Sequence, residues 1–159
     1  MDTVRDFVDL LEALARHEVR YLIVGGLAFV YHAKPRFTKD IDVWVEPTAA
    51  NLQRANRALA EFGSPSLLDT DRPKSILQIG LPPNRIDILQ SIEGASFEAA
   101  WPKRDIAAYG PVQANWIDLD SLIAIKERID DPRHQADAKD LRKVRERRRN
   151  AEAVSPTLD

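Results

Sequence analysis

The most informative part of this chain is residues 21–45, which read YLIVGGLAFVYHAKPRFTKDIDVWV. A short apolar run ends at Gly25-Gly26, and a second apolar run carries Asp40 and Asp42 at its start. Side chains alternate between the two faces of a strand, so both acids project to one face while the apolar residue between them is buried on the other. The stretch therefore predicts two short strands, a tight glycine turn followed by a short helix, and two carboxylates on one face.

Two carboxylates beside a glycine turn are typical of a site for metal ions and phosphate. Glycine lets a phosphate approach the backbone, and carboxylate oxygens are ligands that Mg²⁺ and Mn²⁺ prefer. Asp40 and Asp42 would lie about 6–7 Å apart along a strand and could converge on ions ~3.5–4 Å apart, the arrangement for in-line phosphoryl displacement. The alternative is a solvated strand face, but acids are depleted from strands and repel each other without a cation. We therefore predict that both are catalytic metal ligands.

Asp87 is the third candidate for the same site. It lies between Ile86 and Ile88 in another apolar run. Two-metal sites commonly need a further carboxylate, partly to help deprotonate an attacking hydroxyl. The alternative is that Asp87 faces solvent on an alternating strand and pairs with Arg85. With Asp40 and Asp42 in the same chain, we predict a metal-binding and catalytic role for Asp87.

Three further residues are predicted to bind substrate. Lys126 shares a helical face with apolar residues at spacings of three, four and seven, so its ammonium group either reaches a phosphate or extends to the edge of the core. Arg36 and Thr38 precede the acidic strand, where they either contact the triphosphate or order the loop by hydrogen bonding.

Length and composition indicate a single folded domain. The 159 residues fit one domain, expected over 1–150, with a flexible tail over 151–159. The contents of 44% hydrophobic and 30% charged residues are ordinary for a globular protein, and the absence of cysteine excludes disulfides and thiolate catalysis. No apolar run approaches the ~20 residues of a membrane span, and no signal-peptide pattern opens the chain. We therefore expect a cytoplasmic protein without membrane contact.

The charge is unevenly distributed along the chain. The net charge is −2, but residues 139–149 hold seven Lys or Arg against two acids, so this stretch carries +5 and the remainder −7. A basic stretch of this kind either contacts RNA or an acidic partner, or is a solvated helix end favoured by the helix dipole.

The remaining patterns predict a small sheet covered by helices. We expect helices over residues 3–16, 27–31, 48–62, 97–101, 121–130 and 134–148. We expect strands over residues 20–24, 41–46, 76–79, 86–89 and 112–117. The third and fourth of these strands should form an antiparallel hairpin, and the fifth should lie at an edge of the sheet. This order predicts an α+β fold with a mixed sheet.

Three motifs in this order resemble the polymerase-β-like nucleotidyltransferase superfamily. They are Val24-Gly25-Gly26, Arg36-Phe37-Thr38-Lys39-Asp40-Ile41-Asp42-Val43 and Arg85-Ile86-Asp87. More narrowly, the chain looks like the minimal nucleotidyltransferases of toxin–antitoxin and abortive-infection systems. The likeness spans roughly residues 18–90 and extends weakly to 144 through Leu122-Ile123-Ala124-Ile125-Lys126 and Asp137-x-x-Asp140-Leu141.

The resemblance implies a mixed, mainly antiparallel sheet with flanking helices. It also implies a metal-dependent enzyme that moves a nucleoside monophosphate from an NTP, with ATP expected, to a hydroxyl while pyrophosphate leaves. Asp40 and Asp42 would hold both Mg²⁺ or Mn²⁺ ions, and Asp87 would bind the catalytic ion and favour the acceptor alkoxide. Backbone amides at Gly25-Gly26 would bind the triphosphate.

The acceptor and the biological role stay open. The acceptor is either RNA, such as a tRNA 3′ end held by the basic stretch, or a hydroxyl of a protein. A toxin–antitoxin role would add an antitoxin-like protein partner. The alternatives are a phosphohydrolase using the same metals and a catalytically silent binding or regulatory module. Two departures from the family pattern favour the silent module, namely Leu27 after the glycines and His134-Gln135-Ala136 before Asp137.

Overall fold

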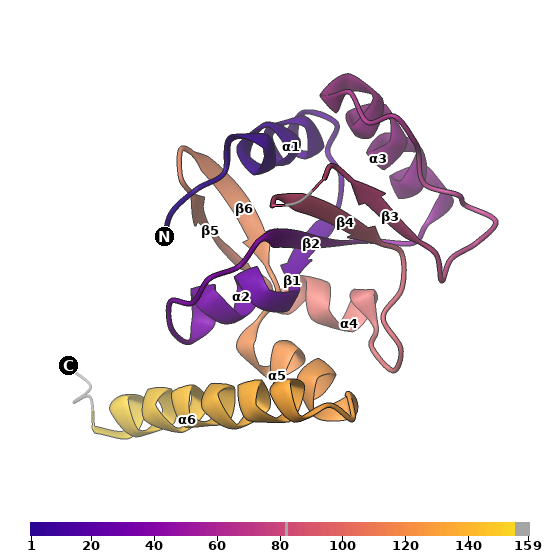
Figure 1. The fold of residues 1–159 in the computed structure, drawn as a ribbon. Coiled ribbons are helices and arrows are strands. Elements are labelled where there is room, and N and C mark those ends of the chain that lie inside the picture. Colours follow the sequence, from indigo (N-terminus) through magenta and orange to yellow (C-terminus); the bar gives the residue numbers. More distant parts are fainter. Residues whose placement is uncertain (82, 155–159) are drawn as a thin grey trace, which may run out of the picture.

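The computed structural model describes residues 1–81 and 83–154 and contains one six-stranded sheet, ordered β3-β4-β2-β1-β6-β5 (Figure 1). The strands are β1 Tyr21–Val24, β2 Asp40–Val45, β3 Ile76–Ile79, β4 Arg85–Leu89, β5 Asp105–Tyr109 and β6 Val112–Trp116. Three neighbouring pairs are antiparallel (β1–β2, β3–β4 and β5–β6), and two are parallel (β2–β4 and β1–β6). The expected α+β fold with a mixed, mainly antiparallel sheet is confirmed.

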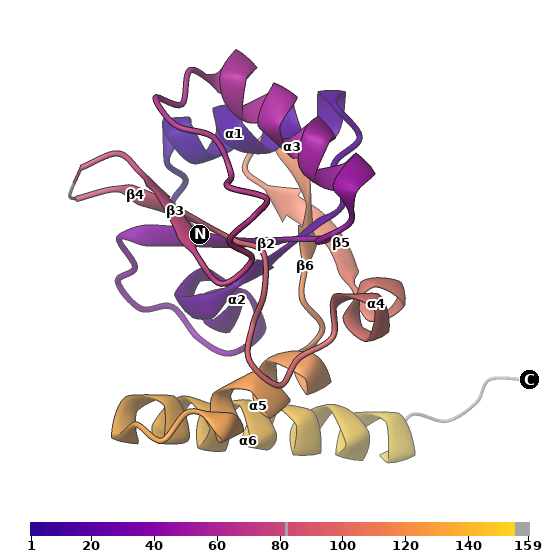
Figure 2. The ribbon, with the colours of Figure 1, turned by 90° about the vertical axis from the view of Figure 1, so that its right-hand side faces the viewer.

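Helices cover both faces of the sheet. They are α1 Arg5–Arg16, α2 Gly25–His32, α3 Ala49–Phe62, α4 Phe97–Ala100, the 3₁₀ helix η1 Trp101–Lys103, α5 Leu119–Arg128 and α6 Pro132–Val154. Helices α1 and α3 lie on one face, whereas α2, α5 and α6 lie on the other, with α5 between α6 and the sheet (Figure 2).

Strand β2 shows how alternation builds these two layers. Ile41, Val43 and Val45 are buried in the core beneath α1 and α3, and Trp44 is buried in the core beneath α2, α4 and α5. The side chains of Asp40 and Asp42 therefore share the face of Trp44. The functional side of the sheet is the side covered by α2, α5 and α6.

Local signals set the helix boundaries near the sheet. The Thr48 hydroxyl accepts a hydrogen bond from the Asn51 amide at 3.3 Å and caps α3, which ends at Gly63 in the left-handed conformation (φ +95°). The Asp118 carboxylate accepts a hydrogen bond from the Ser121 amide at 3.1 Å and caps α5. Helix α5 therefore begins at Leu119, two residues before the start expected from the sequence.

The prediction that the strand over residues 112–117 lies at an edge of the sheet is wrong. Strand β6 pairs with β1 on one side and with β5 on the other, so it is an inner strand. The edge on this side of the sheet is β5, which the sequence patterns did not indicate because Ala107 and Ala108 near its centre are weak strand formers.

The last helix is longer than the expected 134–148. Helix α6 continues to Val154, so residues 151–154 are helical, and residues 155–159 of the expected tail lie outside the described residues. Among the described residues, no helix has the length and apolar character needed to cross a membrane.

Candidate active site

Four charged side chains form a compact block on the functional face of the sheet, on the neighbouring strands β2 and β4. The parallel register places Asp40 opposite Arg85 and Asp42 opposite Asp87. Neighbouring strands lie about 4.8 Å apart, so Asp42 and Asp87 are adjacent across the two strands. We call Asp40, Asp42 and Asp87 the carboxylate block.

Strand β1 brings a glycine against this block. Its last residue, Val24, lies opposite Asp42 in the antiparallel register, and Gly25 follows with φ +68° as the first residue of α2. A Cβ atom placed on Gly25 would lie 2.0 Å from Asp42 Oδ2 and 2.9 Å from its Cγ. Glycine is therefore required at position 25 for two reasons: its backbone is in the left-handed region, and the Asp42 carboxylate fills the space that a Cβ atom would need.

The carboxylate block carries more negative charge than its surroundings neutralise. Burial, then repulsion from Asp87 and a hydrogen bond with it, and then repulsion from Asp40, raise the pKa of Asp42 to about 7, although Lys126 opposes the shift. Near neutral pH the Asp42 carboxyl group is therefore partly protonated and carries less than a full negative charge. A cation at the block would relieve this repulsion.

The donor set of the block fits a hard divalent cation, but another cation already contacts it. Three carboxylates suit Mg²⁺ or Mn²⁺. In the described part of the chain, no three His, Asp or Glu side chains are arranged as ligands of one ion. Instead, Arg85 Nε lies 3.1 Å from Asp87 Oδ1, and Arg85 Nη2 lies 3.2 Å from Asp87 Oδ2 and 3.4 Å from Asp40 Oδ2. A metal ion would have to displace this guanidinium.

A cavity of about 500 Å³ opens beside the block, between the start of α2, α5 and the start of α6. Its walls include Gly25, Gly26, Asp42 and Lys126. The first amides of a helix lack partners within the helix, and no side chain caps α2 among the described residues. Its N-terminus therefore offers backbone N–H groups to an anion in this cavity.

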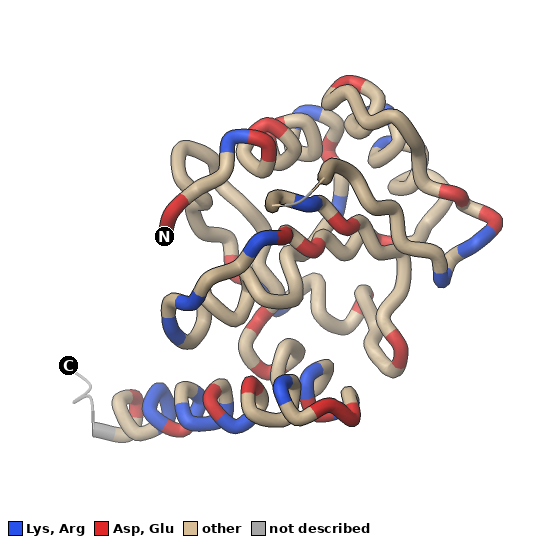
Figure 3. Tube along the Cα trace, in the orientation of Figure 1, with Lys and Arg blue, Asp and Glu red and all other residues tan. Residues whose placement is uncertain are grey.

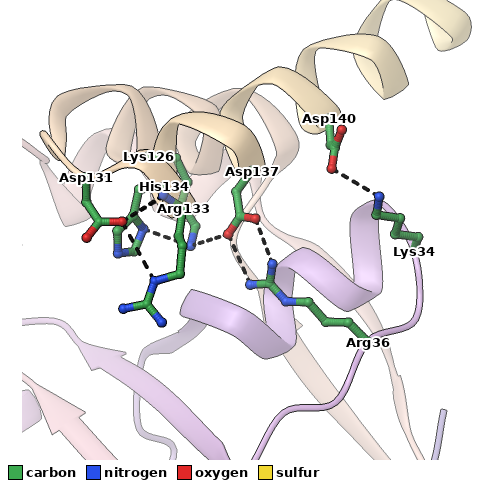
Figure 4. A network of polar contacts seen from close by, with 8 residues as sticks. All are labelled: Lys34, Arg36, Lys126, Asp131, Arg133, His134, Asp137 and Asp140. Atoms are coloured by element: carbon green, nitrogen blue, oxygen red, sulfur yellow. Dashed lines mark hydrogen bonds and ion pairs between the residues drawn. The ribbon is translucent and has the colours of Figure 1, made fainter.

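The far wall of the cavity is a cluster of ion pairs centred on Asp137 of α6 (Figure 4). Arg36 donates to both Asp137 oxygens, at 2.7 and 3.0 Å, and Lys126 Nζ donates to Asp137 Oδ2 at 3.1 Å. Burial raises the pKa of Asp137, but the hydrogen bonds from Arg36 and Lys126 outweigh it and lower the pKa overall. Asp137 is therefore held as an anion that positions two cations at the cavity.

His134 joins the same cluster one helical turn earlier. Lys126 Nζ lies 3.2 Å from His134 Nδ1, which must be unprotonated to accept this hydrogen bond. Burial and the nearby Lys126 charge lower the pKa of His134. A second contact between the α2–β2 loop and α6, Lys34 to Asp140 at 3.2 Å, reinforces the junction.

Replacing Asp137 should destabilise the protein more than replacing Lys126. Lys126 is only 4% exposed. Among the described residues, Asp137 is the one carboxylate that pairs with it. Asp137→Ala would leave this ammonium buried without its anion and should cost about 3 kcal/mol, whereas Lys126→Met leaves Asp137 paired with Arg36 and should cost about 1 kcal/mol. Urea unfolding of both variants measures the difference, and equal costs would contradict it.

The structure brings most of the predicted site residues together. Asp40, Asp42, Asp87, Gly25 and Gly26 all lie at the carboxylate block or the adjoining end of α2. Arg36 and Lys126 line the cavity, and both form ion pairs with Asp137. Thr38 flanks the cavity: a Cβ on Gly26 would lie 3.5 Å from its methyl group.

Asp137, His134 and Arg133 are cavity residues that the sequence patterns did not single out as substrate-binding residues. One signal was available for Asp137. It belongs to the buried stripe of α6 with Ala138 and Leu141, and an acid on such a stripe needs a buried cation.

The sequence matches no protein-family model and no curated protein. Solved structures match at low identity. The lincomycin-bound lincosamide antibiotic adenylyltransferase LnuA has a TM-score of 0.61 at 17% identity, over 89% of this chain and 98% of that one.

Two further matches are of the same kind. ANT(2")-Ia in complex with adenylyl-2"-tobramycin has a TM-score of 0.55 at 12% identity, over 92% of this chain and 95% of that one. A putative nucleotidyltransferase from Thermotoga maritima, TM1012, has a TM-score of 0.55 at 14% identity, over 94% and 91%. This chain has a nucleotidyltransferase-like fold.

Proposed function

We propose that this protein is a metal-dependent nucleotidyltransferase that moves a nucleoside monophosphate from an NTP, with ATP the expected donor, to a hydroxyl acceptor. The observation that carries the proposal is the placement of Asp42 directly opposite Asp87, with Gly25 at the head of α2 resting on the Asp42 carboxylate. Asp42 lines the same cavity as Gly25 and Gly26 at the N-terminus of α2, and Asp87 adjoins Asp42 on the neighbouring strand. Nucleotidyl transfer needs both the acidic ligands and the helix amides, since it positions a polyphosphate against metal ions and a nucleophile.

Each part of the site has a role in this proposal. Asp40, Asp42 and Asp87 would hold Mg²⁺ or Mn²⁺, which when bound neutralises charge on the phosphates and lowers the pKa of the acceptor hydroxyl. The amides at Gly25 and Gly26 bind the triphosphate, whose charge the cations of the Asp137 cluster also attract. Thr38, whose methyl group lies next to Gly26, would donate its hydroxyl hydrogen to the same group.

The reaction itself is a single displacement at phosphorus. The acceptor oxygen forms a bond to the α-phosphorus, and the bond from that phosphorus to the bridging oxygen of pyrophosphate breaks. The proton of the acceptor hydroxyl passes to the Asp87 carboxylate, which lies beside Asp42 on the neighbouring strand.

The basic surface of α6 favours RNA as the acceptor over a protein hydroxyl. This helix carries several exposed cations along its length, visible as blue segments in Figure 3. The exposed ones between residues 139 and 149 are Lys139, Arg142, Lys143, Arg147, Arg148 and Arg149. Of these, Arg142 pairs with Glu127 at 3.3 Å. A surface of this charge suits a phosphate backbone, and binding of this type weakens steeply with salt.

The solved structures with this fold add a third class of acceptor. LnuA is a lincosamide antibiotic adenylyltransferase, and ANT(2")-Ia was solved in complex with adenylyl-2"-tobramycin. A small hydroxylated compound is therefore a further candidate acceptor. An antitoxin-like protein partner belongs to the same proposal and would be sought as a protein that co-purifies with the chain and blocks transfer.

The test supplies every donor and every acceptor class together. The protein is incubated with Mg²⁺ or Mn²⁺, each α-labelled NTP, and cell lysate separated into RNA, protein and small-molecule fractions, with lincomycin and tobramycin as defined small acceptors. Label in the RNA fraction, lost in the Asp87→Asn variant and falling with added salt, is the expected result.

Other outcomes separate the alternatives. Label in protein or in a small compound would keep the enzyme and replace the acceptor, and release of free nucleotide without an acceptor would indicate a phosphohydrolase. If calorimetry shows no NTP binding with metal present, the chain is a silent binding module and the proposal is wrong.

A further inference from the structure

The Arg85 guanidinium takes up the metal-binding oxygens of the carboxylate block. It contacts both oxygens of Asp87 in a fork and reaches one oxygen of Asp40 at 3.4 Å. Forked contacts of this geometry are the strongest that arginine makes with a carboxylate. A metal ion and this guanidinium therefore compete for the same lone pairs and also repel each other.

The position of Arg85 follows from the sheet itself. Arg85 lies opposite Asp40 in the parallel register and two residues before Asp87 on the same strand, so its side chain shares their face. The α-carbon cannot move away without breaking the β2–β4 pairing. Only the side chain can leave, and because it is 36% exposed it can turn into solvent without losing a buried packing site.

We propose that Arg85 is a built-in counter-ion that holds Asp40 and Asp87 together in the metal-free protein and is displaced when the metal binds, so that it sets the metal affinity of the site. This inference rests on the proposed function, because it concerns the ion that the carboxylate block would hold. It adds a positioning residue whose charge acts against the metal.

The test measures Mn²⁺ binding without nucleotide, using the electron paramagnetic resonance signal of free Mn²⁺. Four proteins are compared: wild type, Arg85→Gln, Arg85→Lys and Arg5→Gln. The last is the matched control, because Arg5 is 90% exposed, contacts only the side chain of Asp9 among the described residues, and its loss changes the net charge equally. Asp87→Asn in the wild-type and Arg85→Gln backgrounds shows whether the measured ion is at the block.

Arg85→Gln should bind Mn²⁺ about tenfold more tightly than wild type, because it removes the competing contacts and the like charge. Arg85→Lys, which keeps the charge but loses the fork, should lie between the two, and Arg5→Gln should match wild type. Thermal unfolding supplies a second readout. Metal-free Arg85→Gln should melt below wild type because the carboxylates lose their counter-ion, and Mn²⁺ should raise its melting temperature by more.

The inference is overturned if Arg85→Gln binds Mn²⁺ no more tightly than wild type, or if none of the proteins binds Mn²⁺ at millimolar concentration. The Arg85→Lys variant provides the same comparison if Arg85→Gln does not fold. Failure of the proposed function looks different. In that case Mn²⁺ affinity rises in Arg85→Gln, but no NTP gives nucleotidyl transfer in wild type.

Discussion

The Asp42→Asn variant is expected to be more stable than wild type at pH 8 and to have lost nucleotidyl transfer. Burial, followed by Asp87 and Asp40, raises the pKa of Asp42 to about 7 in the folded protein, compared with 3.8 for a free aspartate side chain. The folded state therefore binds more protons than the unfolded chain between these two values. The free energy of unfolding falls as pH rises through this window, and the contribution of Asp42 is lost above pH 7.

The size of the effect follows from the shift. One pKa unit corresponds to about 1.4 kcal/mol, so a neutral asparagine of the same shape should add roughly 2–4 kcal/mol at pH 8 and clearly less at pH 5. Urea unfolding in EDTA at both pH values measures this difference. Asp71→Asn, an exposed acid on the α3–β3 loop, is the control and should show no such change. A gain that is absent, or equal at both pH values, would contradict the electrostatic account.

The same variant should be catalytically inactive. Asparagine cannot supply the charge that a Mg²⁺ ligand at this position needs, so transfer should fall by at least ~10³-fold. Adding Mg²⁺ at pH 8 should raise the melting temperature of wild type but not that of Asp42→Asn, because only the former gains a ligand of the folded state. Retained activity would remove Asp42 from the proposed site.

The Gly25→Ala variant is expected to lose both stability and activity, with about 3–5 kcal/mol lost from the free energy of unfolding. Two causes act together. The backbone of Gly25 is in the left-handed region at φ +68°, and the new methyl group would collide with Asp42 Oδ2, which a Cβ would approach to 2.0 Å. The Asp42 carboxylate would have to leave its position opposite Asp87, so transfer should also fall by at least about 10²-fold.

Gly63→Ala separates the two causes. Gly63 also has a left-handed backbone, at φ +95°, but no atom lies within 4 Å of a Cβ added there. Its replacement should cost about 1 kcal/mol and leave transfer unchanged, because Gly63 ends α3 far from the cavity. Equal costs at the two glycines would show that backbone strain alone matters at Gly25.

A double-mutant cycle isolates the collision with the carboxylate. In an Asp42→Ala background the two closest atoms are gone, and the nearest remaining contact for the added methyl group is Asp42 Cβ at 3.2 Å. Gly25→Ala should therefore cost less in this background than in wild type. An unchanged cost would mean that Gly25 is required for its backbone conformation only.

Patterns within single elements were readable from the sequence. The alternation of β2 placed Asp40 and Asp42 on one face, and the glycine pair marked the left-handed residue at the head of α2. The helix expected over 48–62 was also readable, and the structure has α3 over Ala49–Phe62, because its apolar residues recur at helical spacing. Where the local signal was weak, as for the alanines of β5, the prediction missed the strand.

Relations between distant elements were decided only by the tertiary structure. The pairing of β2 with β4, with a whole helix and strand between them in the chain, determines that Asp87 faces Asp42 and that Arg85 faces Asp40. The Arg36–Asp137 contact joins residues 101 positions apart, and with the Lys126–Asp137 contact it places both expected phosphate ligands in one ion-pair cluster. The sequence by itself determined which residue types face the site, because strand and helix periodicity are local. Their partners depended on strand register and helix packing, which many distant contacts set together.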